Sequence, residues 1–485
     1  MVKEWKMYVD GKWVSSLSGE TFDVINPATG QVVAKVPKGS GEDAELALKA
    51  AAREKEKFAA MSVYERAKLV RKAADEVDKR KEEIAKVLSM EQGKPYEAEA
   101  LPEVEEAVEN LYLAAEDVIR LEGRTIAVRD NNKRLLTFSV ARGVYAIITP
   151  WNFPVVIPSE FVGPGLAVGN TMVLKPASYT PLSLLLFTEC IEKAGFPTGV
   201  FNVVTGPGGT VGQALAGSPL TDAIGFVGET VTGKQIGKTA GAKPLLLEMG
   251  GNGPLIVLED ANLDAAANAA AFGCYYNAGQ VCVATERILV HQKIKEKFLE
   301  LLLERTKKYV PQDPLAPGAN MGPLNNEPTA QKMDLHLKDA VEKGARIIYG
   351  GKRLENKPTK LYYQPTIVDN VNEDMLLNKE ETFGPVAPLI TFSDYDEALR
   401  IANGTIYGLQ SAVFTSNLKK AFYFAEHLQT GNVVINDSTD YWDINHPFGG
   451  GAGKQSGFGR LGGRDAILAM SETKCVAFDI SNVID

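Results

Sequence analysis

The sequence predicts an α/β protein built from two αβ lobes and a small additional β-layer. At 485 residues the chain is too long for one hydrophobic core. From residue 136 onward, short β-branched runs alternate with helical segments, a pattern that indicates βαβ units and parallel sheets. A second series of the same kind begins near residue 254, so we expect two such lobes.

The expected elements follow one another along the chain. A hairpin over 7–14 and a second strand pair over 22–37 come first, and residues 41–120 carry apolar positions at helical spacing. The first αβ series comprises "GVYAIITP", "TMVLKP", "LLLFTECIEKAG", "FNVVTG", "VGQALAG", "AIGFVGE" and "GKQIGKTAG". The second comprises "PLIVLED", "RILVHQ", a helix over 293–307, "ARIIYGG", "QPTIVDNV", "PVAPLITF", "SAVFTS" and "GNVVIND". The strand-like "RLLTFSVAR" and "KCVAFDI" are predicted to form the extra β-layer, and the lobes to meet near "LLLEMGGNGP".

Composition narrows the class of function. A formal charge of −9 argues against a surface that binds nucleic acid, which needs a basic face. Four scattered cysteines favour reduced thiols in a cytosol over a disulfide framework, and none has the spacing of a zinc site, so no metal is predicted. The N-terminus lacks the pattern of a secretory signal, and no apolar run is long enough for a membrane helix. We therefore expect a soluble, cytoplasmic protein that acts on a small molecule.

Three residues are candidates for catalysis. Cys282, in "NAGQVCVATERI", follows a predicted turn of small residues, where free backbone N–H groups can favour a thiolate. Asn152, in "TPWNFP", can donate to an oxyanion, and Glu248, in "LLLEMGG", can act as a general base. The residues alone leave structural alternatives open: an inert core cysteine, a turn-forming asparagine, and a glutamate that caps a helix or forms a salt bridge. Cys190 and Cys274 fall in helical patterns and Cys475 in a strand-like one, which favours structural roles.

Glycine-rich turns indicate where phosphate groups can bind. In "GFVGETVTGK", Gly228 and Gly233 flank a predicted turn from strand to helix, and "TGPGGTVG" is another such link. Neither matches the common GxGxxG fingerprint, and glycine-rich turns occur in any αβ protein. Lys175, at a strand end in "VLKPAS", has two possible roles, contact with a ribose or phosphate and simple solvation.

Taken in order, "TPWNFP", "LKPAS", "GFVGETVTG", "LEMGG", "GQVC", "EETFGPV" and "PFGG" resemble the motif series of the aldehyde dehydrogenase superfamily, from "NPATG" at residues 26–30 nearly to the C-terminus. The glycine-rich "GFGRLGGRD" ending also resembles members that act on benzaldehyde-like compounds. The resemblance implies an NAD(P)-dependent enzyme that oxidises an aldehyde to the acid through a thioester, with Cys282 as nucleophile, Asn152 as oxyanion donor and Glu248 as general base. It also implies a homodimer or homotetramer.

The resemblance further implies two Rossmann-like αβ lobes and a β-arm used for oligomerisation. The expected dinucleotide-binding domain covers 1–122 and 142–247, the arm covers 123–141 and 469–485, and the catalytic domain covers 248–468. The residues expected at the cofactor are Pro150, Trp151, Lys175, Ser178, Gly208, Gly212, Phe226, Gly228, Glu229, Thr230, Gly233, Met249, Gly250, Glu381 and Phe383.

The sequence departs from the family pattern in four places. Glu229 replaces a common serine in the phosphate turn, where it either caps the helix N-terminus or repels phosphate. Ser178 stands where NAD-preferring members often carry a glutamate, which predicts that NADP is at least accepted. The segment "PFGGGAGKQSGFGR" is two residues longer than usual, and the common glutamate after Arg460 is absent, which argues against a second carboxylate relay.

Motif spacing places apolar and aromatic residues along the aldehyde tunnel, which favours a medium aliphatic or aromatic aldehyde. These residues are Phe153, Ile157, Tyr276, Trp442 and Phe448. Glu160 is the exception, because many members carry an aromatic residue near that position. Alternatives are a semialdehyde or glyceraldehyde-type dehydrogenase and a crystallin-like protein without turnover. A CoA-acylating enzyme is disfavoured by Glu248, and a cysteine esterase does not explain Lys175, Glu381 and Phe383 together.

Overall fold

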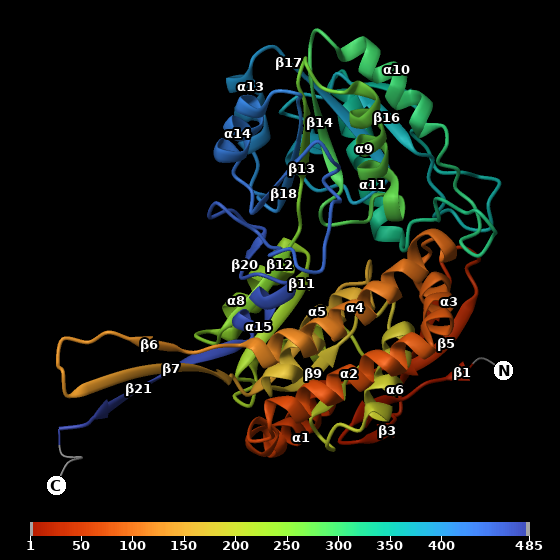
Figure 1. Cartoon of the computed structure of the whole chain (residues 1–485). Helices are drawn as coiled ribbons and strands as arrows, with labels where there is room; N and C mark the ends of the chain where they lie inside the picture. The colour runs from red at the N-terminus through yellow and green to blue at the C-terminus, as the bar shows by residue number, and fades with distance from the viewer. Residues whose placement is uncertain (1–2, 482–485) are drawn as a thin grey trace.

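The computed structural model describes residues 3–481, which form two αβ lobes with a narrow β-arm projecting from one of them (Figure 1). The first lobe is built on an eight-stranded sheet in the order β20-β12-β11-β8-β9-β10-β2-β3. The five central strands are parallel, whereas β20, β2 and β3 join antiparallel at the edges. The strand bounds are Met7–Val9 (β2), Lys12–Val14 (β3), Val144–Ile148 (β8), Thr171–Lys175 (β9), Phe201–Val203 (β10), Ala223–Gly228 (β11), Leu245–Met249 (β12) and Gly457–Phe458 (β20).

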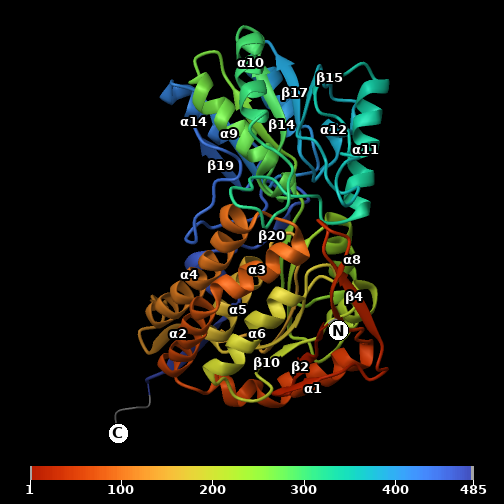
Figure 2. The ribbon, with the colours of Figure 1, turned by 90° about the vertical axis from the view of Figure 1, so that its right-hand side faces the viewer.

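Helices cover both faces of this sheet, which explains its continuous apolar strands. Along β8, Val144, Ala146 and Ile148 pack in one core cluster with α1, α7 and α8, whereas Tyr145 and Ile147 pack in another with α2 to α6. Figure 2 shows α1 beneath β2 and β10 at the base of the lobe. The helices are Gly41–Ala59 (α1), Val63–Lys79 (α2), Lys81–Gln92 (α3), Leu101–Asp117 (α4), Val156–Val168 (α5), Leu182–Ala194 (α6), Gln213–Gly217 (α7), Thr230–Ala240 (α8) and Gly463–Ala469 (α15), with short turns at Tyr96–Ala100 (η1), Val118–Arg120 (η2) and Gly208–Gly212 (η3).

The second lobe contains a seven-stranded sheet in the order β15-β16-β17-β14-β13-β18-β19, parallel except for β15. Its strands are Gly253–Val257 (β13), Thr285–His291 (β14), Arg346–Tyr349 (β15), Thr366–Asp369 (β16), Val386–Phe392 (β17), Gln410–Phe414 (β18) and Asn432–Ile435 (β19). Its helices are Leu263–Tyr275 (α9), Lys295–Thr306 (α10), Glu327–Glu342 (α11), Leu376–Lys379 (α12), Tyr395–Asn403 (α13) and Leu418–His427 (α14), and Tyr276–Gly279 (η4) follows α9.

Two smaller sheets complete the chain. The arm pairs Lys133–Ala141 (β7) antiparallel with Ser471–Asp479 (β21) and with Arg124–Ile126 (β6). It extends well beyond the body of the first lobe in Figure 1. The other sheet joins Lys3–Glu4 (β1), Val32–Pro37 (β5) and Thr21–Ile25 (β4).

The predicted α/β class, the two αβ lobes and the extra β-layer are confirmed, and the elements follow the predicted order. The connection between lobes lies at residues 250–252, between β12 and β13, but β20 returns from the end of the chain to pair with β12. Residues 1–2 and 482–485 of the predicted domain ranges lie outside the described residues. Within residues 3–481, no helix has the length and apolar character needed to cross a membrane.

Candidate active site

Cys282 lies in a strained connection between α9 and β14. Three successive residues, Asn277, Ala278 and Gly279, have φ values of 48°, 53° and 74°, in the left-handed region that is costly for residues other than glycine. Gly279 also has no room for a side chain, because a Cβ there would lie 2.2 Å from the Gly384 carbonyl oxygen. The predicted turn before the cysteine is therefore present, and the surrounding structure holds it in place.

Asn152 lies in the turn that links β8 to α5, directly beside the cysteine segment. Its side-chain Nδ2 donates to the Gln280 carbonyl at 3.0 Å, and its own carbonyl accepts from Asn277 Nδ2 at 3.2 Å. An amide nitrogen carries two hydrogens, so one donor remains for a ligand. The two motifs are thus joined by reciprocal hydrogen bonds.

Glu248 is the penultimate residue of β12 and only 3% exposed. Its Oε1 is buried and has no hydrogen-bond partner among residues 3–481. Burial raises the pKa of Glu248 to about 8, with Glu381 adding to the rise and the Cys282 thiol opposing it. Burial, followed by repulsion from Glu248 and Glu381, holds the pKa of Cys282 well above its usual value. Both side chains line the same cavities, and burial favours the neutral, protonated form of each.

Two cavities meet at these residues, and both are lined by Val227, Glu248 and Cys282. One, of about 300 Å³, also includes Asn152 and seven of the residues predicted at the cofactor. Those seven are Pro150, Trp151, Gly228, Glu229, Gly250, Glu381 and Phe383. The other, of about 390 Å³, is lined by all five residues predicted for the aldehyde tunnel. Those are Phe153, Ile157, Tyr276, Trp442 and Phe448. A nucleophile, a base and an amide donor therefore stand where two separate ligand spaces join.

A third cavity, of about 560 Å³, lies between η3, α7 and α8 and includes Gly208 and Gly212. Glu229 occupies the N-cap position of α8, but its side chain makes no capping hydrogen bond. The first turn of this helix therefore presents backbone N–H groups without a side-chain acceptor from Glu229.

The remaining residues predicted at the cofactor lie outside these three cavities. Phe226 and Met249 pack in the core beside the sheet, and a Cβ on Gly233 would lie 2.2 Å from Met249 Sδ. Thr230 Oγ1 donates to the Gln455 carbonyl at 3.3 Å. Ser178 lines a separate cavity beside Asn26 and Asn325 and donates to the Gly206 carbonyl at 3.1 Å.

Lys175 ends β9 in a fully enclosed position, and burial lowers its pKa to about 8. Its Nζ donates to the Pro176 carbonyl at 2.7 Å and makes no ion pair within residues 3–481. A buried cation without a counter-charge is costly unless a ligand supplies acceptors.

Sequence reasoning missed several lining residues. Asn326, Thr329 and Lys332, at the start of α11, line the cavity with Glu381, while Glu106 and Asp440 line the aldehyde-side cavity. Their local sequence gives no signal, because charged and polar residues in helices and loops usually face solvent. Only the fold brings them to the site.

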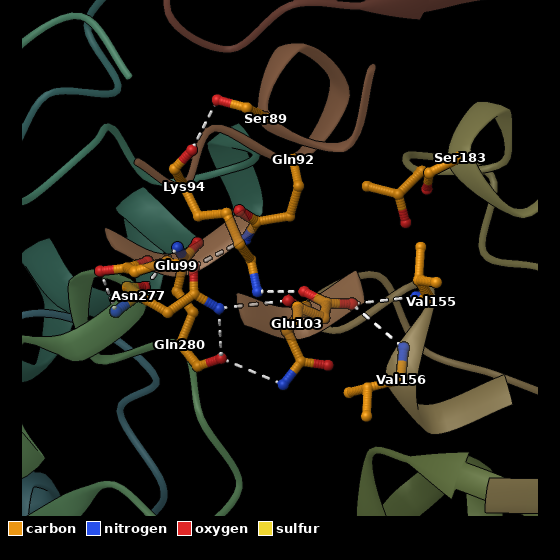
Figure 3. A network of polar contacts seen from close by, with 12 residues as sticks. Ser89, Gln92, Lys94, Glu99, Glu103, Val155, Val156, Ser183, Asn277 and Gln280 are labelled. Atoms are coloured by element: carbon orange, nitrogen blue, oxygen red, sulfur yellow. Dashed lines mark hydrogen bonds and ion pairs between the residues drawn. The ribbon is translucent and has the colours of Figure 1, made fainter. Parts of the chain in front are cut away.

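A buried polar network holds the Asn152 and Cys282 segments together (Figure 3). Lys94 Nζ pairs with Glu103 at 2.6 Å, with both side chains wholly inaccessible to solvent. The other Glu103 oxygen accepts from the backbone N–H groups of Val155 and Val156, at 2.9 and 3.3 Å, where α5 begins. These contacts fix the segment that directly follows Asn152.

The same network holds the strained turn before Cys282. Glu99 accepts from the Asn277 backbone N–H at 3.1 Å, and Gln92 donates to the Asn277 side chain at 3.0 Å. Lys94 also lies 3.7 Å from the centroid of the Phe153 ring, on the wall of the aldehyde-side cavity. Residues 89–103 therefore contact both sides of the site.

The longer glycine-rich loop near the C-terminus positions Glu248. Gly457 pairs with Glu248 across the β20–β12 contact, and the Met249 N–H donates to the Ser456 carbonyl at 3.0 Å. Ser456 Oγ donates to the Gly250 carbonyl at 2.7 Å. The loop thus fixes the backbone on both sides of the buried carboxylate.

Comparison with known proteins agrees with the geometry. The chain matches the model described as "Aldehyde dehydrogenase family" over residues 13–476. It is 39% identical to the NADP-dependent succinate-semialdehyde dehydrogenase of Escherichia coli, over 96% of each chain, and 38% identical to the mitochondrial benzaldehyde dehydrogenase of Antirrhinum majus, over 98% of this chain and 89% of the relative. Among solved structures, an NAD-dependent aldehyde dehydrogenase from Sinorhizobium meliloti matches with a TM-score of 0.96 at 37% identity, over 99% of this chain and 96% of that one.

Proposed function

The chain belongs to the aldehyde dehydrogenase family, and from this premise we propose how its own residues perform the reaction. The enzyme oxidises an aldehyde to a carboxylic acid with NAD(P)+ as oxidant. The assignment of roles rests on one observation, that Cys282 and Glu248 line both cavities. A dinucleotide in one cavity and an aldehyde in the other can therefore both reach the nucleophile.

The residues present fit a nicotinamide dinucleotide. Lys175 is a buried cation that has no acidic partner within residues 3–481, and the first turn of α8 lacks a cap from Glu229. We expect α8 and Lys175 to hold the phosphates and a ribose, and Glu381 and Phe383 to hold the nicotinamide end. When bound, the nicotinamide ring accepts a hydride from the carbon attached to the Cys282 sulfur.

Cys282 acts as the nucleophile. Its proton passes toward Glu248, directly or through a water, and Sγ forms a bond to the aldehyde carbon. The carbonyl oxygen becomes negative, and the Cys282 backbone N–H and the second hydrogen of Asn152 Nδ2 stabilise it. Oxidation of this adduct leaves a thioester on Cys282. Glu248 releases the cysteine proton to solvent and then takes a proton from water. The water oxygen adds to the thioester carbon, the carbon–sulfur bond breaks to regenerate the Cys282 thiolate, and the acid leaves.

We assign the domains as the family resemblance implies, with 1–122 and 142–247 binding the dinucleotide and 248–468 supplying the catalytic cysteine. The arm, over 123–141 and 469–485, is proposed to join subunits into a dimer or tetramer. Leu136, Phe138 and Phe478 on the arm are 37%, 46% and 47% exposed, which supports burial against another subunit. A reducing, cytoplasmic compartment suits the free thiol of Cys282.

NADP is proposed to be at least accepted as a cofactor beside NAD. Ser178 places no carboxylate near Lys175, whereas a glutamate at this position would repel a 2′-phosphate. A kcat/KM that strongly favoured NAD would contradict this proposal.

The aldehyde is proposed to have an aliphatic or aromatic body, because the cavity opposite the cofactor side has apolar and aromatic walls. The test follows the absorbance of reduced nicotinamide with aliphatic, aromatic and phosphorylated aldehydes, each with NAD and with NADP. We expect turnover that the Cys282→Ala variant loses. Turnover that persists in this variant, or none with any pair, would overturn the assignment.

A further inference from the structure

The aldehyde-side cavity contains three carboxyl groups besides the proposed base. Glu106 comes from α4, Glu160 from α5 and Asp440 from the loop after β19, so three separate elements bring them to one cavity of about 390 Å³. None of the described residues that line this cavity is Lys, Arg or His; Lys94, 3.7 Å from the centroid of the lining Phe153 ring, is already paired with Glu103. The cavity is therefore acidic without any internal cation to balance it.

Two of these carboxyl groups, those of Glu160 and Asp440, lack the partners that buried acids normally have. Glu160 is only 7% exposed, every residue of its helix α5 is buried, and its side chain makes no hydrogen bond or ion pair in the described part of the chain. Both carboxyl oxygens of Asp440 are also buried without a partner there. Since an isolated buried acid is costly, a structural role does not account for these groups.

Burial and mutual repulsion disfavour the charged forms of these carboxyl groups. Burial raises the pKa of Glu160 well above its usual value, with further rises from Glu106 and Glu248. Burial, then repulsion from Glu103, raises the pKa of Glu106 to about 7. A cation in the cavity would relieve this repulsion and release protons from the acids, whereas an anion would increase it.

Aromatic rings supply the rest of the wall. Phe272 stacks on Tyr276 with ring centroids 5.0 Å apart, and the Trp442 and Phe448 rings meet edge to face at 4.8 Å. Aromatic faces attract ammonium groups and still accommodate an aliphatic body. The same walls therefore suit a substrate that is apolar near its aldehyde and positively charged elsewhere.

We propose that the substrate is an amino aldehyde whose ammonium group, primary or quaternary, lies among Glu106, Glu160 and Asp440 while its carbonyl reaches Cys282. This inference rests on the proposed function and specifies the class of aldehyde. It separates this chain from its relatives named for succinate and glutarate semialdehydes, whose negative charge this cavity disfavours.

Matched aldehydes test the charge preference. Aminopropanal is compared with butanal, and trimethylammonio-acetaldehyde with dimethylbutanal, because each pair has nearly the same shape and differs in charge; succinate semialdehyde is the anionic member. We expect kcat/KM to be about tenfold higher or more for the cationic member of each pair, and lowest for the anion. The Glu160→Gln variant should lose this preference, with the ratio of kcat/KM between the members of each pair falling toward one. Glu105→Gln is the control, since Glu105 is on the same helix but pairs with Lys81 at the surface.

A binding measurement separates this inference from the proposed function. Choline and its neutral isostere dimethylbutanol are titrated calorimetrically into the Cys282→Ala protein, and into the same protein with Glu160→Gln. We expect choline alone to bind, with proton release, and Glu160→Gln to weaken it by about tenfold. Equal binding of both alcohols, or equal turnover of both members of each aldehyde pair, would overturn the inference and leave the proposed function standing. Absence of all turnover would instead contradict the proposed function, and the choline titration would still decide whether the cation site exists.

Discussion

At the scale of single residues, catalysis depends on the proton carried by Glu248. Its sequence context predicts a carboxylate beside the cysteine, but the raised pKa comes from burial, with a smaller contribution from Glu381. A group with a pKa of about 8 is mostly protonated at pH 7 and becomes a base as the pH rises. Because Glu248 and Cys282 affect each other, the observed pKa values belong to the pair.

We predict that kcat rises with pH through about 8, because the deprotonated fraction of Glu248 grows over this range. The Glu248→Gln variant should retain the fold and lose kcat by about a hundredfold or more, since water attack on the thioester then lacks its base. The measurement is the steady-state rate of nicotinamide reduction between pH 6 and pH 9, with thermal melting as a control for folding. An unchanged pH profile in the variant would exclude Glu248 as the titrating group.

At the scale of elements, the sequence predicts where strands end but not what holds the ends together. "TPWNFP", "LEMGG" and "GQVC" are recognisable because turn residues and strand ends have local signals. Lys94 and Glu103 have none, since a lysine or glutamate in a charged helical block is usually exposed. Their burial results from the packing of α3, η1 and α4 against α5, which sequence patterning does not specify.

We predict that Lys94→Met lowers kcat by about tenfold or more and lowers thermal stability, because Glu103 remains buried without its cation, at a cost of about 3–5 kcal/mol. Adding Glu103→Gln should restore stability, since glutamine is neutral and still offers one oxygen to Val155 and Val156. If the melting temperature is restored while kcat stays low and NADP binding is unchanged, the loss of activity shows that Lys94 positions the Asn152 turn. Lys86→Met, on the exposed side of α3, is the control; full activity of Lys94→Met would contradict the prediction.

The loop that pairs with β12 gives a second prediction at this scale. Gly457 has φ +102°, and a Cβ there would lie 2.0 Å from the Leu247 carbonyl oxygen. We expect Gly457→Ala to displace the β20–β12 contact and lower kcat by about tenfold or more. Gly453→Ala is the matched control, because Gly453 also has a positive φ of +69° but has open space around its Cβ. Equal effects of the two substitutions on kcat would mean that backbone strain alone, rather than the contact with Glu248, is responsible.

At the scale of the whole molecule, the fold is largely predictable and the charge of the site is not. Short apolar segments that alternate with helical segments predict both sheets, because strands covered by helices on both faces must be apolar. The acids of the aldehyde-side cavity come from α4, α5 and a distant loop, so their meeting depends on the packing of the two lobes. Glu160 is the exception that the sequence identifies, because many members of the family carry an aromatic residue near this position.

This concentration of buried acids leads to a prediction for the stability of the entire protein. Burial raises the pKa of Glu91, Glu99, Glu248 and Glu381 to about 8 in each case. The unfolded chain releases these protons near pH 4.3, so between that pH and about 8 the folded state binds more protons and its stability falls as the pH rises. Each group contributes at most about 1.4 kcal/mol per pH unit.

We therefore expect the melting temperature to fall by several degrees between pH 6.5 and pH 8. In a protein of this size, a loss of about 1 kcal/mol in the free energy of unfolding lowers the melting temperature by at most about 2–4 °C. Burial lowers the pKa of His336 to about 4, and because the unfolded histidine titrates at about pH 6.5, its effect on stability is nearly complete at the lower end of this window. Glu248→Gln removes one of the groups and should make the fall less steep, whereas Glu105→Gln, at the surface, should not change it. Melting curves at fixed protein concentration in buffers of matched ionic strength provide the measurement. A melting temperature that stayed constant or rose over this window would mean that the buried acids are ionised in the folded protein, with counter-charges that the isolated chain lacks.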